Sequence, residues 1–206
     1  ISNLLMSDDV MHTLNALKAM GVNIVILEDR IVITGKGLHS LKEPKKQIYL
    51  GNSGTSARLL TGLLSSQDFN STLTGDESLS RRPMKRIIEP LQLMGAIIKS
   101  QSGNLPINIF ASKLKNINYE IKVPSAQVKS GIILAALNTS GKTIINETNI
   151  TRDHTEIMLK SFGSNIQIEK KFNVNKITVE GNIELKSKNL SIPSDLSSAS
   201  FFIIAA

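Results

Sequence analysis

One pattern of residues occurs three times along the chain, and this repetition limits the folds that the chain can adopt more than any other feature. Each copy contains an amphipathic segment that stops at a glycine: Gly21, Gly95 and Gly163, at spacings of 74 and 68 residues. Each copy also contains an apolar segment that follows a polar turn beginning at a serine: Ser53, Ser125 and Ser194, at spacings of 72 and 69 residues. Two independent landmarks therefore agree on one period, which indicates similar supersecondary units packed against one another.

The amphipathic segments are predicted to be helices that end at the glycine. Their sequences are SDDVMHTLNALKAMG, SRRPMKRIIEPLQLMG and TRDHTEIMLKSFG. Each begins with Ser or Thr and charged residues, and apolar residues at helical spacing follow. Pro83 is expected in the first turn of the second helix, and Asp153 together with Glu156 is expected to cap the third. Alternating apolar residues predict a pair of strands after each glycine, within 24–34, 97–110 and 166–181.

The apolar segments are predicted to be buried helices that expose only their first turns. They read SGTSARLLTGLLSS, SAQVKSGIILAALNTSG and SDLSSASFFIIAA. Asp195 and Ser197 are expected to cap the third of them. The predicted fold class is α/β, an inside-out repeat domain in which three βαβαββ-like units surround a pseudo-threefold axis, with helices buried and sheets outside. We expect residues 1–206 to form a single domain, with approximate repeats 1–69, 70–143 and 144–206.

Charge and composition narrow the kinds of partner. The formal net charge of +7 favours an anionic partner. A nucleic acid is disfavoured because the chain has no Trp and only two Tyr to stack on bases, whereas small phosphorylated metabolites fit at least as well. The lack of Cys excludes a disulfide framework, a thiolate nucleophile and a Cys-based zinc site, and it is compatible with a cytoplasmic protein. His12 and His39 have no partners at metal-ligand spacing, and no apolar run approaches the roughly 18 residues that would suggest a membrane span.

The stretch LGNSGTSARLL, residues 50–60, joins a glycine-containing loop to a helix start with one arginine. Helix N-termini carry unpaired N–H groups and a partial positive charge, so the backbone at Ser53, Gly54 and Thr55 is suited to an anion. Arg58, one turn into the helix, either reaches that anion or braces the loop, and the sequence leaves both roles open. The alternative is that the glycines only form a turn and that Arg58 extends into solvent.

Five motifs together resemble the family of 5-enolpyruvylshikimate-3-phosphate synthases, the enolpyruvyl transferases of the shikimate pathway. They are, in chain order, LGNSGTSARLL, TGDESLSRRPMKRIIEPLQLMGA, VPSAQVKSGIILAAL, TRDHTEIMLKSFG and IPSDLSSASFFIIAA. Because the motifs span the whole chain, they are more specific than any one glycine-containing loop. SAQVKS and TRDHTE are similar to the bacterial branch that includes glyphosate-insensitive enzymes. The resemblance implies the enolpyruvyl transferase type of inside-out α/β fold.

The resemblance also implies two sets of binding residues. The set for phosphoenolpyruvate comprises Asn52, Gly54, Thr55, Arg82 and Gln127. The set for shikimate 3-phosphate comprises Ser125, Ala126, Gln127 and Arg152. The family uses no metal and no organic cofactor, and the resemblance assigns no catalytic role to His154. Lys129 follows the second set on an otherwise buried helix, as either a ligand or a buttress.

Members of the family contain two three-repeat domains with the active site in the cleft between them. The resemblance implies that this chain is a fragment, the shikimate-phosphate-binding half, and that its partner is the second domain of the same enzyme. The catalytic acid and base residues are then expected outside the 206 residues, which alone are predicted to be inactive. The other implied partners are the two small anionic substrates in the cytoplasm, with no nucleic acid and no membrane.

Three alternatives remain open at this point. The sister enolpyruvyl transferase for UDP-N-acetylglucosamine is disfavoured because most of its members use a loop cysteine, which this chain lacks. The others are a non-catalytic anion-binding domain on the same repeat and a nucleic-acid binder. Glyphosate-insensitive relatives often carry Ala at the position of Gly54, and typical sensitive enzymes carry Pro at the position of Leu59. These two positions together predict partial sensitivity to glyphosate.

Overall fold

The structure is a computed structural model that describes residues 1–171, 174–193 and 204. The helices are α1 (Asp8–Ala19), α2 (Gly54–Ser65), α3 (Glu77–Ser80), α4 (Lys85–Leu93), α5 (Ala126–Leu137) and α6 (His154–Ser161). The strands are β1 (Asn23–Ile26), β2 (Ile31–Thr34), β3 (Ile48–Tyr49), β4 (Ser71–Thr74), β5 (Ile97–Gln101), β6 (Asn104–Phe110), β7 (Asn118–Glu120), β8 (Lys142–Glu147), β9 (Ile166–Lys171) and β10 (Val174–Glu180). The predicted third buried helix, with Asp195 and Ser197, lies outside the described residues.

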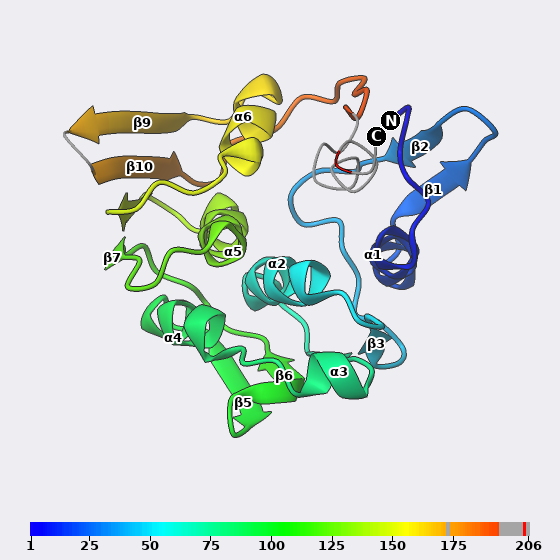
Figure 1. Ribbon diagram of the computed structural model, residues 1–206, viewed down its shortest axis with the longest axis horizontal. Helices are drawn as coiled ribbons and strands as arrows, with labels where there is room; N and C mark the ends of the chain where they lie inside the picture. Colours follow the sequence, from blue (N-terminus) through cyan, green and yellow to red (C-terminus); the bar gives the residue numbers. More distant parts are fainter. Residues whose placement is uncertain (172–173, 194–203, 205–206) are drawn as a thin grey trace.

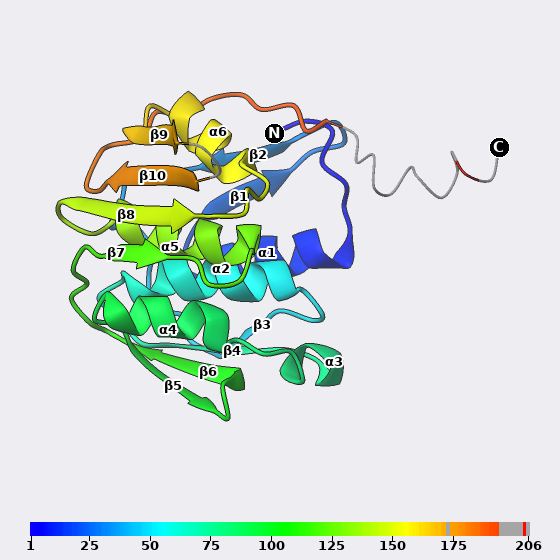
Figure 2. The same cartoon turned by 60° about the vertical axis from the view of Figure 1, so that its left-hand side comes forward.

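Helices α2 and α5 lie toward the centre of the molecule, and the hairpins β1–β2, β5–β6 and β9–β10 lie along its periphery (Figure 1). Seen from the side in Figure 2, helices α5, α2 and α4 run alongside one another between the strands. Two sheets have four strands each, in the orders β3-β4-β6-β5 and β7-β8-β10-β9. In both, the first pair of strands is parallel and the other two pairs are antiparallel. The predicted inside-out α/β arrangement is therefore confirmed.

The sheet that contains β1 and β2 is extended by two segments from opposite regions of the chain. Ser2 forms an antiparallel bridge with Arg30 and a parallel bridge with Ser191. Two backbone hydrogen bonds hold this contact, from Ser2 N to Leu190 O at 2.8 Å and from Ile192 N to Ser2 O at 3.0 Å. The order of Ser191, Ser2, β2 and β1 thus repeats the parallel and antiparallel pattern of the two larger sheets. This contact closes the ring seen in Figure 1.

We propose that the structural units of the domain follow the sheets. One unit spans 48–110 and the next spans 118–180, and the third joins residues 1–34 to residues 190–192. The approximate repeats 1–69, 70–143 and 144–206 stay a prediction. Their boundaries differ from those of the sheet-based units, because β3 and α2 belong to the unit 48–110, and β7 and α5 belong to the unit 118–180.

Each predicted strand pair is an antiparallel hairpin, β1 with β2, β5 with β6 and β9 with β10. The glycine that precedes each hairpin has a left-handed backbone, with φ of +86° at Gly21, +100° at Gly95 and +87° at Gly163. Residues other than glycine rarely adopt this backbone conformation, and helices commonly end at a residue that has it. The glycines therefore end the helices as predicted, and each hairpin begins where the helix stops.

The starts of the second and third amphipathic helices were predicted incorrectly. Ser80 ends α3 instead of starting a helix, because Asp76 caps that short helix by accepting a hydrogen bond from Leu79 N at 2.7 Å. Pro83 lies before α4, whose N-cap is Met84, and not in its first turn. The Met84 N–H instead donates to Gly103 O at 2.8 Å, in the hairpin turn between β5 and β6.

The predicted capping pair at the start of α6 is also wrong. Asp153 occupies the N-cap position, but its side chain makes no capping hydrogen bond and its ψ of 21° is not the extended value typical of caps. Glu156 is 1% exposed and turns inward to Lys129. The ion pair with a distant helix therefore replaces the local cap.

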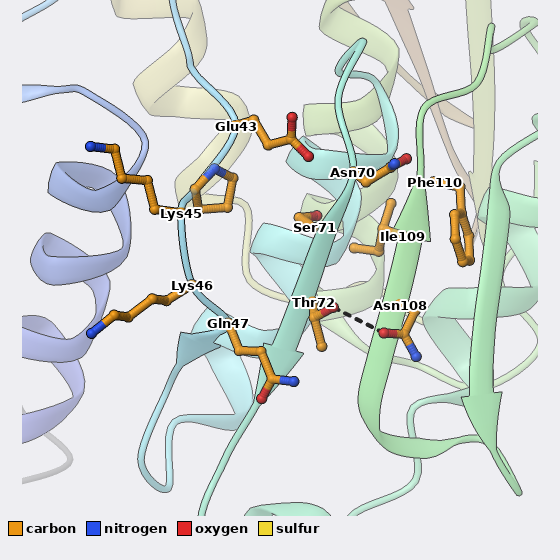
Figure 3. Close-up of a pocket in the computed structure, with 11 residues that line it drawn as sticks. Glu43, Lys45, Lys46, Gln47, Asn70, Ser71, Thr72, Asn108, Ile109 and Phe110 are labelled. Carbon is orange, nitrogen blue, oxygen red and sulfur yellow. Dashed lines mark hydrogen bonds between the residues drawn. The ribbon is translucent and has the colours of Figure 1, made fainter.

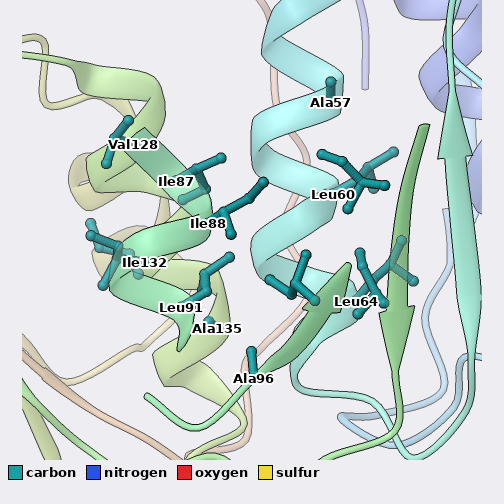
Figure 4. Packing of buried hydrophobic residues seen from close by; sticks show 14 of the residues in the cluster. Ala57, Leu60, Leu64, Ile87, Ile88, Leu91, Ala96, Val128, Ile132 and Ala135 are labelled. Atoms are coloured by element: carbon teal, nitrogen blue, oxygen red, sulfur yellow. The ribbon is translucent and has the colours of Figure 1, made fainter. Parts of the chain in front are cut away.

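The core is centred on the contact between α2 and α5, with α4 packed against both (Figure 4). Leu64, Ile87, Leu91 and Ile132 are at most 1% exposed. Burial of each such side chain contributes about 1.5–3 kcal/mol. A Cβ atom added at Gly62 would lie only 2.0 Å from the carbonyl oxygen of Gly131, so the two helices approach backbone to backbone. Among the described residues, no helix has the length and apolar character needed to cross a membrane.

Candidate functional site

The first turns of α2 and α5 meet at one end of the core. Gln127, on α5, donates from Nε2 to the Thr55 hydroxyl on α2 at 2.8 Å. Each helix begins with a serine cap, since Ser53 Oγ accepts from Ser56 N and Ser125 Oγ accepts from Val128 N, both at 3.3 Å. The N-termini of these two buried helices therefore lie at one common end of the core, and their unpaired N–H groups give this end a partial positive charge.

Arg58 braces this end of the core. Its Nη1 donates to Gly54 O at 3.0 Å and to Gln127 Oε1 at 2.9 Å, and its Nη2 donates to Pro83 O at 3.1 Å. One guanidinium therefore joins the first residue of α2, the first turn of α5 and the segment before α4. These acceptors decide between the two open roles in favour of the brace.

Two further arginines make this end strongly cationic. Burial lowers the pKa of Arg58, and the positive charges of Arg82 and Arg86 lower it further. Arg82 is exposed, and its Nη2 donates to Asn52 Oδ1 at 2.6 Å. A Cβ atom added at Gly54 would lie 2.9 Å from Arg58 Nη1 and 3.1 Å from Arg82 Nη1. Gly54 thus lies where two guanidiniums converge, which suits a bound phosphate or carboxylate.

The second predicted set of residues lies on the other side of Gln127. A pocket of about 190 Å³ is lined by Thr55, Leu59, Ala126, Gln127, Ser130, Arg152, His154 and Thr155. Ala126, Gln127 and Arg152 belong to the predicted shikimate 3-phosphate set. Ser125, the fourth member of this set, is the N-cap of α5 and directly precedes Ala126. Gln127 contacts both sets, because it bonds to Thr55 and Arg58 and also lines the pocket.

Two larger cavities lie away from these residues. One of about 350 Å³ lies between the segment before β3 and strands β4 and β6 (Figure 3). There the Thr72 hydroxyl donates to Asn108 Oδ1 at 2.9 Å, and Lys45 and Lys46 point away from this pair in Figure 3. The other, of about 530 Å³, lies near the ends of α2 and α5 and includes Ser66 and Asn138. Neither cavity contains a residue of the predicted binding sets.

The family model described as EPSP synthase (3-phosphoshikimate 1-carboxyvinyltransferase) matches residues 1–206. The chain belongs to the EPSP synthase family. Curated 3-phosphoshikimate 1-carboxyvinyltransferases from Vesicomyosocius okutanii and Ruthia magnifica are 50% and 49% identical to it over 207 residues. Each alignment covers 100% of this chain and 47% of the relative.

A solved EPSP synthase from Acinetobacter baumannii matches this chain with a TM-score of 0.90 and 46% sequence identity. The match covers 100% of this chain and 46% of that protein, so the chain spans about half the length of the relatives it matches. The resemblance inferred from the five motifs is therefore confirmed, together with the fold class. The roles of the individual site residues stay predictions.

Sequence reasoning missed two features of this member of the EPSP synthase family. Arg86 lies close enough to Arg58 to lower its pKa, and only its position four residues after Arg82, which is typical of one face of a helix, could have pointed to it. Glu147 is a carboxylate that is 1% exposed at the end of β8. It lies at the end of an otherwise ordinary strand, and no motif identified it.

The sequence left open whether Lys129 is a ligand or a buttress, and its contacts identify it as a buttress. Its side chain is 1% exposed and pairs with Glu156 at 2.8 Å and Glu147 at 3.3 Å. His154 lines the pocket beside Arg152, and Asp153 lies between them in the sequence. Among the described residues of the domain, no group of three or more His, Cys, Asp and Glu side chains is arranged to hold a metal ion.

Proposed function

We propose that this chain is the substrate-binding half of an enzyme that transfers the enolpyruvyl group of phosphoenolpyruvate to the 5-hydroxyl of shikimate 3-phosphate and releases phosphate. One observation carries the proposal: Gly54 lies where the guanidiniums of Arg58 and Arg82 converge, and Gln127 joins this place to the pocket of Arg152. Two adjoining cationic sites suit two anionic substrates that must react with each other. The names of the relatives give this chemistry its substrates.

In the proposed reaction, the 5-hydroxyl oxygen gives up its proton and adds to C2 of phosphoenolpyruvate, while C3 gains a proton. The tetrahedral intermediate then loses phosphate and a proton from C3, which restores the double bond. In this chain, Arg82 and the backbone at Gly54 hold phosphoenolpyruvate, and Ser125, Ala126 and Arg152 hold the phosphate of the second substrate. Asn52 and Thr55 support them, since they bond to Arg82 and Gln127.

The proton transfers are assigned to the second domain of the same enzyme, across the cleft. The contribution of this half is to bring the two anions together and to stabilise the charge on the leaving phosphate. The proposed setting is the cytoplasm, where the enzyme acts without a metal or an organic cofactor.

Phosphate release by the full-length protein tests the proposal. We expect phosphate release that requires both phosphoenolpyruvate and shikimate 3-phosphate, and no release when UDP-N-acetylglucosamine replaces shikimate 3-phosphate. The 206-residue chain alone is expected to give no turnover, because it holds only half of the site. Turnover with the UDP-sugar, or by this chain alone, would contradict the proposal.

A second prediction concerns Gly54→Ala in the full-length protein. The added methyl group would lie 2.9 Å from Arg58 Nη1 and 3.1 Å from Arg82 Nη1, so both guanidiniums must shift by a few tenths of an ångström. We expect KM for phosphoenolpyruvate to rise roughly tenfold, which corresponds to about 1.4 kcal/mol of lost binding. Glyphosate inhibition is expected to weaken as well.

Steady-state kinetics with Gly54→Ala and Gly35→Ala measures this effect. No atom lies within 4 Å of a Cβ added at Gly35, so this control should keep the parent KM. An unchanged KM and an unchanged inhibition curve for Gly54→Ala would show that phosphoenolpyruvate does not bind at the place where the two guanidiniums converge.

A further inference from the structure

Three buried charged side chains lie behind the pocket, and the proposed reaction does not use them. Lys129 comes from α5, Glu147 from the end of β8 and Glu156 from α6, and each side chain is 1% exposed. Lys129 Nζ lies 2.8 Å from Glu156 Oε1 and 3.3 Å from Glu147 Oε2. Removing water from three charges is costly, and replacing such pairs by apolar residues is often neutral or stabilising. Stability alone therefore does not explain the cluster.

Glu147 links the cluster to the loop that carries Arg152. Its Oε1 accepts hydrogen bonds from the backbone N–H of Thr151, at 2.9 Å, and from the Thr151 hydroxyl. Lys129 Nζ donates to the carbonyl oxygen of the same residue at 3.5 Å. The N–H, hydroxyl and carbonyl groups of Thr151 are thus all held by Glu147 and Lys129.

A second contact holds the other side of this loop. The hydroxyls of Ser130, on α5, and Thr155, on α6, are hydrogen-bonded at 2.7 Å. Arg152 lies between these two attachments in the sequence and lines the pocket with Ala126 and Gln127 from the first turn of α5. The loop that carries Arg152 is therefore fastened to α5, the helix that presents Ala126, Gln127 and Ser130 to the pocket.

We propose that Glu147 and Lys129 are positioning residues that hold Arg152 against the N-terminus of α5, in register with the groups that receive the phosphate of shikimate 3-phosphate. This inference rests on the proposed function. Neither residue contacts the substrate. A binding group is effective only when the residues behind it fix its position, and here the buried charge cluster supplies that support.

The two carboxylates of the cluster differ in a way that makes one a control for the other. Glu147 accepts hydrogen bonds on both oxygens, from Lys129 on Oε2 and from Thr151 on Oε1. A glutamine at 147 must present its NH₂ group to one of these donors and loses that bond. Glu156 accepts only on Oε1, and its Oε2 has no partner among the described residues. A glutamine at 156 can therefore keep its bond to Lys129.

Glu147→Gln and Glu156→Gln in the full-length protein remove the same buried charge beside the same lysine. We expect Glu147→Gln to raise KM for shikimate 3-phosphate about tenfold, with KM for phosphoenolpyruvate changed less than about twofold. Glu156→Gln is expected to leave both KM values within about twofold of the parent, whatever it does to the thermal midpoint. Equal effects of the two variants on KM for shikimate 3-phosphate would overturn the positioning role.

Substitutions at Thr151 give a second test, which does not depend on whether the Glu147→Gln variant folds. Thr151→Val removes the hydroxyl that donates to Glu147 and keeps the shape of the side chain, whereas Thr151→Ser keeps the hydroxyl. We expect Thr151→Val to raise KM for shikimate 3-phosphate about threefold, and Thr151→Ser to restore the parent value. If Thr151→Val leaves KM for shikimate 3-phosphate unchanged, the hydroxyl bond to Glu147 does not position Arg152 and the proposal is wrong.

A double-mutant cycle with Arg152→Ala separates this inference from the proposed function. If Glu147 acts through Arg152, Glu147→Gln adds no further rise in KM once Arg152 is alanine. Fully additive effects would show that Glu147 acts elsewhere. If Arg152→Ala itself leaves KM for shikimate 3-phosphate unchanged, the binding role proposed for Arg152 is wrong. A large effect of Arg152→Ala without one of Glu147→Gln overturns only the inference made here.

Discussion

Gly62→Ala is expected to destabilise the domain by about 3 kcal/mol or more, the upper end of the usual cost of overpacking. The new methyl carbon would lie 2.0 Å from the carbonyl oxygen of Gly131 and 2.8 Å from its Cα. Both are backbone atoms in the middle of α5, so no side-chain rotation can relieve the clash. The two buried helices would have to separate, and the contacts of the surrounding core would be lost.

The sign of the change in unfolding free energy for Gly62→Ala shows whether α2 and α5 are in backbone contact at this position. In an exposed helix, replacing glycine with alanine stabilises by up to about 1 kcal/mol, because glycine has low helix propensity. Urea denaturation of the full-length protein measures the change. Gly35→Ala, where no atom lies within 4 Å of the new Cβ, is the matched control and is expected to stay within about 0.5 kcal/mol of the parent. A stabilising Gly62→Ala would mean that α2 and α5 do not touch at this point.

Arg82→Ala is expected to lower kcat/KM for phosphoenolpyruvate by roughly 100-fold in the full-length protein. Hydrogen bonds to charged groups contribute about 1.5–3 kcal/mol, and about 1.4 kcal/mol corresponds to a factor of ten. The Arg82 side chain is exposed and is oriented by Asn52, so it is available to a ligand. Arg82→Lys should recover only part of the loss, because an ammonium cannot form the paired bonds of a guanidinium.

Arg81→Ala is the control for this substitution. Arg81 is the exposed neighbour of Arg82 and pairs with Glu77 on the surface of α3. It carries the same charge but is directed to another partner, so its removal should change kcat/KM less than about twofold. Equal losses for the two variants would mean that only the overall positive charge matters, and the specific role of Arg82 would then be wrong.

The features that could be predicted from the sequence depend on residues close together in the chain. The helix stops at Gly21, Gly95 and Gly163 were predicted correctly because each combines a local periodic pattern with a residue that tolerates positive φ. The hairpins after them were predicted from their alternating apolar residues. The positions of α2 and α5 were predicted for the same reason, because an apolar run follows a polar turn that begins at Ser53 and at Ser125.

The features that were missed depend on residues far apart. Glu156 turns inward because Lys129, on another helix, lies opposite it, and this interaction replaces the predicted cap. The start of α4 at Met84 involves Gly103, whose carbonyl oxygen accepts from Met84 N. The role of Arg58 was left open because its acceptor Gln127 lies 69 residues away. Local patterns therefore predicted the elements, and the resemblance to a family supplied the candidate site residues. The contacts that position those residues came only from the tertiary structure.

The pairing of Ser2 with Leu190 and Ile192 has a consequence for the order of folding. Ser2 and Leu190 are 188 positions apart, while the strands within each large sheet belong to one stretch of chain. Contacts at long sequence separation cost more chain entropy to close and slow folding. The two large sheets can form from segments that are close in the sequence. Once they have formed, less flexible chain remains between Ser2 and Leu190. The sheet of β1 and β2 is therefore expected to be completed last, by a ring-closing step that follows the assembly of the other two.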